Sequence, residues 1–158
     1  MVKGKREVHK LSSAERGGFI TVVTCMSADG QFIPAMIIFP KKNKKSVHGD
    51  GAPAGSLIEY NPSGRISSML FTKWFRHFIK YVHATEEDPV ILIFDDHFSH
   101  MRNLQIINLA RENHIILICL PPHCSSEMQP LNIAFMKPFK TYYSSEIETW
   151  LANNPGRV

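Results

Sequence analysis

Two apolar segments rich in β-branched residues open the patterned part of the chain, at residues 19–26 and 32–39. Between them lie Ser27, Ala28, Asp29 and Gly30, and an Asp-Gly pair flanked by apolar runs is the strongest short signal for a β-hairpin. Pro34 lacks a backbone N–H, so it favours an edge position or a bulge in the second strand. The pattern predicts an antiparallel hairpin.

Helical spacing dominates residues 67–82, where either Ser67 or Ser68 is a suitable N-cap. The opposite face carries Lys73, Arg76 and Lys80, so the segment is amphipathic. We expect this helix to pack on a sheet through its apolar face. That face consists of Phe71, Trp74, Phe75, Phe78, Ile79 and Val82.

A strand, a helix and a second strand follow. Residues 90–94 are apolar throughout, which is typical of a central strand buried on both faces, and residues 115–120 repeat the pattern. Residues 103–113 predict a short amphipathic helix, and this order is that of a βαβ unit with parallel strands. Residues 133–150 predict a last helix that Pro138 interrupts early. The residues expected to face inward from the short helix are Leu104, Ile107, Leu109 and Ala110.

The remaining segments are polar connections. Residues 1–17 form a loose basic lead-in, and residues 40–66 form a long loop rich in Lys, Gly, Pro, Ser and Asn. The 158 residues are enough for a single domain. A hairpin followed by a parallel βαβ unit predicts an α/β fold, with a mixed sheet of the ribonuclease-H type flanked by helices.

Composition narrows the class of protein. Hydrophobic residues make up 44% and charged residues 20%, the balance of a soluble globular domain, and no apolar run approaches the roughly 20 residues that cross a bilayer. The basic start is not followed by the apolar stretch of a secretory signal. Three cysteines without a CxxC pair favour reduced thiols, with Cys25 and Cys119 as core residues. We therefore expect an intracellular protein.

The excess of positive charge lies in one tract. The net charge is +4, from 18 basic and 14 acidic residues, and removing the four lysines of this tract leaves 14 of each. A tract of this kind can contact phosphates or direct nuclear import. The alternative is a solvated loop after a strand. The lysines are Lys41, Lys42, Lys44 and Lys45.

The residues that could take part in catalysis or metal binding follow the strand predicted at 90–94. Asp95 and Asp96 follow it directly, and Pro121, Pro122 and His123 follow the next strand. Carboxyl ends of parallel strands share one edge of a sheet, and carboxylates are the ligands that Mg²⁺ prefers. Asp95 and Asp96 are therefore candidate metal ligands, and the alternative is that one of them caps the following helix. The spacing of the histidines matches no usual zinc pattern.

Four ordered segments resemble the catalytic domain of DDE-type transposases of the pogo/Tigger type, whose relatives include the Jerky proteins and centromere protein B. The similarity extends over nearly the whole chain, and four segments at the family's spacing are more specific than any one alone. The segments are Leu11-Ser12-Ser13-Ala14-Glu15-Arg16-Gly17, the strand 91–94 with Asp95-Asp96-His97-Phe98-Ser99-His100, Leu120-Pro121-Pro122-His123-Cys124-Ser125, and Met128-Gln129-Pro130-Leu131-Asn132.

The resemblance implies a ribonuclease-H-like fold, three acidic ligands, two Mg²⁺ ions, and cleavage and joining of DNA strands. Asp95 matches the second acid, and Asn132 stands at the third acid position. The first acid belongs to a strand upstream of residues 11–17, and the chain begins too late to contain it. Asp29 lies in the hairpin turn, and Glu127 would need a five-residue shift in register. We expect Mg²⁺ binding to be weak or lost and the domain to be catalytically inactive.

The resemblance also implies a partial domain that lacks the family's first strand, which is central in such sheets. Residues 19–26 and 90–94 would then each present an open edge, which a second copy or another protein is expected to cover. The main functional hypothesis is a nuclear, transposase-derived domain that contacts DNA phosphates non-specifically. One alternative is an active Mg²⁺-dependent nuclease or strand-transferase within a longer chain. Another is a domesticated scaffold for protein–protein interaction.

Overall fold

The hairpin forms the start of a three-stranded sheet. The computed structural model describes residues 19–40, 49–95, 103–122 and 124–155. Strand β1 (Thr21–Met26) pairs antiparallel with β2 (Phe32–Phe39) across a turn in which Gly30 takes a φ of 87°. The register between β1 and β2 shifts between Val23 and Cys25, opposite the stretch that contains Pro34. Pro34 therefore sits at a bulge, the second of the two positions expected for it.

The three-stranded sheet is completed by a segment expected to lack structure. Strand β3 (Leu57–Tyr60) pairs parallel with β2, which makes β2 the central strand in the order β1-β2-β3. The structure thus differs from the long loop expected over residues 40–66. Four residues are too few to show a clear period in the sequence, and pairing with β2 fixes their conformation.

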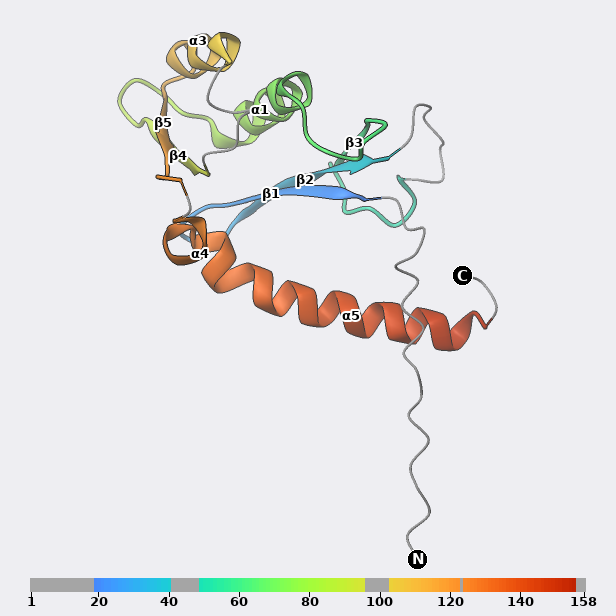
Figure 1. The fold of residues 1–158 in the computed structure, drawn as a ribbon. Helices are drawn as coiled ribbons and strands as arrows, with labels where there is room; N and C mark the ends of the chain where they lie inside the picture. The colour runs from blue at the N-terminus through green and yellow to red at the C-terminus, as the bar shows by residue number, and fades with distance from the viewer. Residues whose placement is uncertain (1–18, 41–48, 96–102, 123, 156–158) are drawn as a thin grey trace, which may run out of the picture.

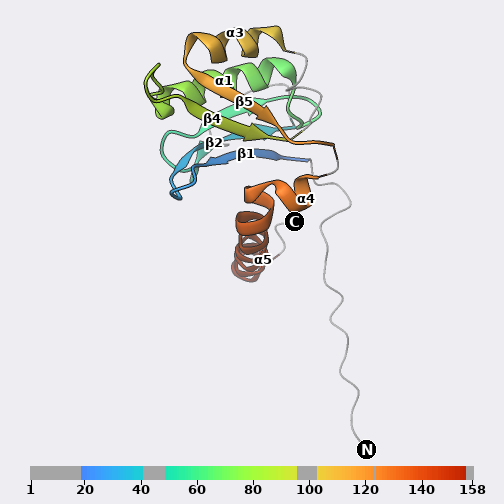
Figure 2. The same cartoon turned by 90° about the vertical axis from the view of Figure 1, so that its left-hand side faces the viewer.

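The predicted βαβ unit forms a second sheet. Strands β4 (Val90–Phe94) and β5 (Ile115–Cys119) pair parallel, and the helix α3 (Leu104–Glu112) connects them. Among the described residues the two sheets remain separate. Figure 1 and Figure 2 show both sheets lying beneath the same layer of helices.

The helix α1 (Ser68–Val82) joins the two sheets through the core. Ser67 is its N-cap, and the Oγ atom of Ser67 accepts a hydrogen bond from the backbone N–H of Leu70 at 3.3 Å. The buried face of α1 follows the predicted spacing closely. The core brings this face against both sheets and α3, and consists of Met36, Ile38, Leu70, Phe71, Trp74, Phe75, Phe78, Leu92, Ile106, Ala110 and Ile115.

Burial on both faces of the parallel strands was a wrong prediction. Leu92 is buried under the helices, but Ile91 and Ile93 on the other face of β4 are 56% and 47% exposed. The described helices α1 and α3 cover only one face of these strands, and a uniformly apolar run does not reveal how many faces are covered. The inward face of α3 agrees in part with the expected one, because Ala110 is buried and Leu109 packs against the core. It differs in that Ile106 is buried, whereas Leu104 and Ile107 are 69% and 38% exposed.

Cys25 and Cys119 lie inside β1 and β5, but of the two only Cys25 belongs to the described core, to which both were expected to belong. Cys25 packs against the core, and burial raises the pKa of its thiol to about 11. The thiol therefore stays protonated and unreactive at neutral pH, which fits a packing role.

Candidate functional site

Asp95 stands at the carboxyl end of the parallel pair. It follows β4 directly, and Phe94 at the end of β4 is in register with Cys119 at the end of β5. The backbone N–H of Leu120 donates to the carbonyl of Phe94 at 2.9 Å, so the two strands leave the sheet together. The structure confirms that the segments that follow β4 and β5 both begin at the carboxyl edge of the two-stranded sheet. Asp96, His97, His100 and His123 lie outside the described residues.

Asn132 belongs to a π-helical turn that follows β5. Helix α4 (Ser125–Met128) leads into η3 (Leu131–Phe135), and Asn132 is the second residue of η3. Its side chain is exposed, and its Nδ2 atom donates to the Oε1 atom of Gln129 at 2.8 Å. The amide of Asn132 is therefore oriented by a neighbouring side chain. An amide at this position has a carbonyl oxygen for a cation but no negative charge.

The π-helical turn is continuous with the last helix, α5 (Met136–Asn153). Pro138 in the first turn of α5 has no N–H to donate and crowds the carbonyl four residues earlier, which a wider preceding turn accommodates. Phe135 stacks on Phe139 with ring centroids 5.5 Å apart and contacts Phe32 at 5.2 Å. These contacts fix η3 against the start of β2. In Figures 1 and 2, α4 lies just below the carboxyl ends of β4 and β5.

The two other acids considered in the sequence lie apart from a metal site. Asp29 accepts hydrogen bonds from the Ser27 hydroxyl and from the Nε2 atom of Gln31 within the hairpin turn. The hydrogen bond from Ser27 holds the pKa of Asp29 below its usual range. Glu127 is exposed on α4. Within the described parts of the chain, no three His, Cys, Asp or Glu side chains are grouped closely enough to hold a metal ion.

Asn103, expected only as the start of a helix, positions α3 against α1 through its side chain. Its Nδ2 atom donates to the Oγ1 atom of Thr72 at 2.8 Å and to the carbonyl of Ser68 at 3.2 Å. Thr72 is 7% exposed, so this link is largely shielded from water. This link fixes the N-terminus of α3 on α1. In the sequence, the sign of such a link is Thr72, a polar residue among the apolar positions of α1.

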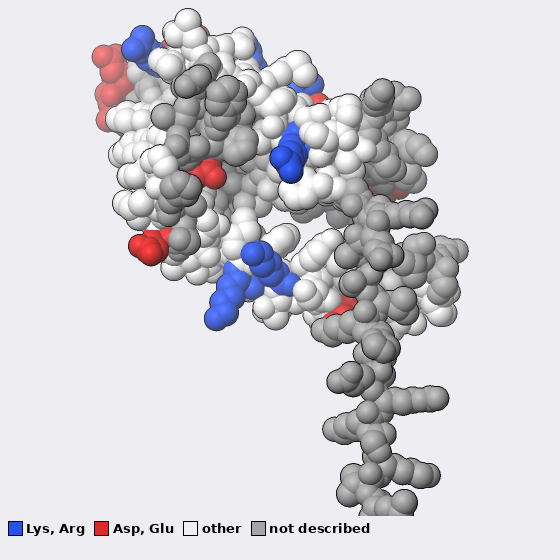
Figure 3. Space-filling model, in the orientation of Figure 1, with Lys and Arg blue, Asp and Glu red and all other residues white. Residues whose placement is uncertain are grey.

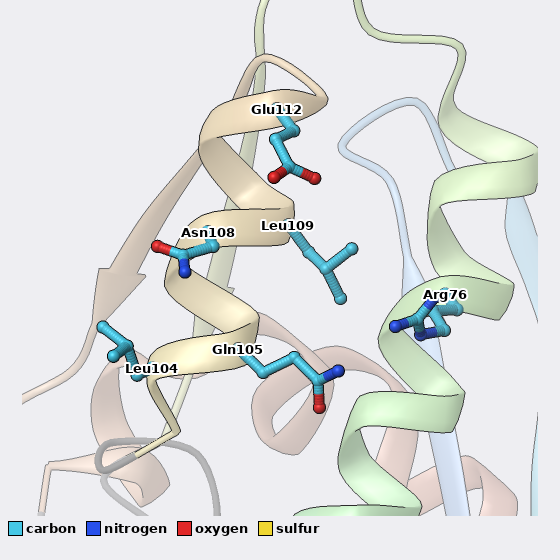
Figure 4. A pocket seen from close by; sticks show the side chains of 6 residues that line it. All are labelled: Arg76, Leu104, Gln105, Asn108, Leu109 and Glu112. Carbon is cyan, nitrogen blue, oxygen red and sulfur yellow. The ribbon is translucent and has the colours of Figure 1, made fainter.

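A shallow groove of about 470 Å³ lies between α1 and α3. Figure 4 shows Gln105 and Leu109 of α3 extending toward Arg76 of α1, with Glu112 at one end. Neither Asp95 nor Asn132 lines this groove. It therefore belongs to the helical layer and is not part of the candidate site.

In the view of Figure 3, most basic and acidic side chains of the described surface are scattered, and one small group of adjacent basic side chains lies below the centre of the molecule. One of the cations is paired, because the Nζ atom of Lys73 lies 3.0 Å from the Glu59 carboxylate. The expected DNA-contacting lysines, Lys41, Lys42, Lys44 and Lys45, lie outside the described residues.

Comparison with known proteins gives two matches. The family model of the DDE superfamily endonucleases matches residues 19–157. A protein named MFS-type transporter clz9, from Cochliobolus lunatus, is 31% identical over 154 residues, which cover 94% of this chain and 16% of that protein. The chain thus spans about a sixth of the length of this relative. No solved structure matches. Within the described residues, every helix is too short or too polar to cross a membrane.

Proposed function

This chain belongs to the DDE superfamily endonucleases, and on that premise we propose that it is a transposase-derived, DNA-associated domain without strand-cleaving activity. The observation that carries the proposal is the amide of Asn132 at the position of the family's third acid. Asp95 supplies one carboxylate at the end of β4. A magnesium ion gives up water reluctantly, and the charge of its carboxylate ligands offsets this cost. One carboxylate with one amide should hold Mg²⁺ far more weakly than three carboxylates.

The pogo/Tigger type, with the Jerky proteins and centromere protein B as relatives, is the subfamily we propose. The support is the order and spacing of the four sequence segments that end at residues 17, 100, 125 and 132. Two of these segments lie at the carboxyl ends of the parallel strands, where Asp95 follows β4 and Leu120 follows β5. The same resemblance supports a ribonuclease-H-like arrangement.

We further propose that the family's first strand belongs between β1 and β4. Among the described strands, β1 pairs only with β2 and β4 pairs only with β5, so each has one side that no described strand pairs with. Figure 2 shows β1, β2, β4 and β5 all lying below α1. An extended segment there would pair with both edges and join the sheets, and it would supply the first acid. An active nuclease within a longer chain would require this strand, and Asn132 argues against activity even then.

Restoring the third acid tests the metal part of the proposal. We expect calorimetric titration with Mg²⁺ and Mn²⁺ to detect at most weak binding by the native chain. Asn132→Asp should increase the affinity for Mn²⁺ roughly tenfold, because it restores a carboxylate at the position of the family's third acid. Asn108→Asp adds the same charge on exposed α3 and should change nothing. Tight binding of two ions by the native chain would overturn the proposal.

Salt dependence of DNA binding tests the nucleic-acid part. We expect a short duplex labelled with a fluorophore to bind non-specifically, with an affinity that falls as salt rises because phosphate contacts release counterions. Replacing Lys41, Lys42, Lys44 and Lys45 by Gln should reduce the slope of log affinity against log salt by about 3 to 4, at roughly 0.9 for each contact. The same import-type tract supports a nuclear location.

Unchanged binding in the four-lysine variant would place the DNA contacts elsewhere on the chain. No salt-dependent affinity in the native chain would favour a protein-interaction scaffold instead. A duplex of scrambled sequence is the control, and it should bind as well as the first, because phosphate contacts carry no sequence information.

A further inference from the structure

Helix α5 carries an apolar stripe along one side. Met136, Phe139, Tyr143, Ile147 and Trp150 are spaced by three, four, four and three residues, which places them on one face of a helix. Phe139, Tyr143, Ile147 and Trp150 are 39%, 59%, 40% and 50% exposed, and no residue of α5 is buried within the described structure. The stripe is thus an apolar face of α5 that the described residues leave about half exposed.

An 18-residue helix in this situation needs a packing surface. Most helical stability in proteins comes from packing an apolar face, since isolated helices of this length are marginal in water. In Figures 1 and 2, α5 runs below the three-stranded sheet as a separate rod. In its first half, Phe139 stacks between Phe135 and Tyr143.

We propose that the occupant of the α5 stripe is the α5 stripe of a second copy of this chain, packed antiparallel about a two-fold axis near Tyr143. In this arrangement Phe139 packs near the partner's Ile147, and Met136 packs near the partner's Trp150. Both pairs lie at equal distances in sequence from Tyr143, so the stripe is self-complementary. A two-fold contact requires this property.

The available area fits such a contact. Aromatic side chains of this size present about 150–250 Å² each, so the half-exposed stripe, with Ile133 and Tyr142 beside it, offers roughly 600 Å² of apolar surface. A stable interface buries about 800 Å² from each partner, of which somewhat over half is apolar. The α5 surface of one copy therefore has the extent that a dimer needs.

The charges of α5 favour the antiparallel direction. Lys137 and Lys140 lie in its first half, and Glu146 and Glu148 lie in its second half. Antiparallel pairing places the basic half of each helix beside the acidic half of the other and also opposes the two helix dipoles. Parallel pairing would place like charges together, which is unfavourable. The charges of α5 therefore favour the antiparallel direction, and its apolar stripe provides the contact surface.

Sedimentation velocity over a concentration series tests the dimer. We expect the native chain to shift from monomer to dimer with rising concentration. Tyr143→Glu, which places two carboxylates at the two-fold axis in an apolar contact, should weaken dimerisation at least a hundredfold. Ser145→Glu adds the same charge on the opposite side of α5 and should leave the dimer unchanged. Circular dichroism of each variant checks that α5 remains helical.

Charge reversal tests the direction of pairing. Lys137→Glu with Lys140→Glu should weaken the dimer roughly tenfold, because both halves of α5 become acidic. Adding Glu146→Lys and Glu148→Lys should restore it, since the halves are complementary again. A native chain that remains monomeric to about 100 μM, or a dimer that is indifferent to Tyr143→Glu, overturns the proposal and assigns the stripe to a different partner. Persistent weakening in the fourfold variant overturns the antiparallel direction.

Discussion

Replacing Gly64 by Ala should reduce the free energy of unfolding by about 3 kcal/mol or more, because two independent costs add at this residue. Gly64 is buried with a φ of 66°, a conformation that costs an alanine roughly 1 kcal/mol. A Cβ atom at this position would lie 1.8 Å from the carbonyl oxygen of Phe19 and 2.9 Å from its carbonyl carbon. Backbone must therefore move, and urea denaturation monitored by circular dichroism measures the loss.

The surroundings of Gly64 leave little room for that movement. The N–H of Gly64 donates to the carbonyl of Asn61 at 2.8 Å, and the Nδ2 atom of Asn61 donates to the carbonyl of Arg65 at 2.7 Å. Gly51 is the matched control, since its φ is 79° but an added Cβ would meet nothing within 4 Å. Gly51→Ala should lose only about 1 kcal/mol. Equal losses in the two variants would show that the clash with Phe19 is relieved without cost.

Phe75→Ala should cost about 3–5 kcal/mol, a large fraction of the stability of a domain of this size. Phe75 is fully buried on α1, and its ring stacks on Phe78 with centroids 5.8 Å apart. Its removal leaves a cavity in the core that joins α1 to the sheets, in addition to the lost burial of apolar area. The same denaturation experiment measures this loss.

Met69→Ala on the same helix is the control for Phe75→Ala. Met69 is 68% exposed, and methionine and alanine have similar helix propensities, so its replacement should change stability by less than about 0.5 kcal/mol. A Phe75→Ala variant as stable as Met69→Ala would mean that α1 does not pack on the sheets in solution. Loss of cooperative unfolding in Phe75→Ala would agree with the expected effect.

Local signals in the sequence predicted the hairpin, α1 and the parallel pair. The Asp-Gly turn, the cap at Ser67 and the spacing of the aromatic residues of α1 each act within a few residues, and the structure bears out all three. Strand β3 was missed because its conformation depends on pairing with β2, about twenty residues earlier. Exposure of Ile91 was missed because the covering of a strand depends on distant elements.

The candidate site was also predictable only where it depends on local features of the sequence. Asp95 was placed correctly at the end of a parallel strand, since the end of an apolar run is a local feature. The π-helical turn around Asn132 was not predicted, and the interruption expected at Pro138 is absent from α5, which runs from Met136 to Asn153. The Asn103 link to Thr72 joins residues 31 positions apart, a distance at which helical periodicity carries no information.

The separation of the two sheets has a consequence for the order in which the molecule opens. Backbone hydrogen bonds hold β1, β2 and β3 together and, separately, β4 and β5, while α1 connects the two groups by side-chain packing. Amide protons in the two groups should therefore exchange with solvent in two cooperative units of different free energy. Loosening α1 would release both units at once, whereas fraying of β4 from β5 would leave the three-stranded unit protected.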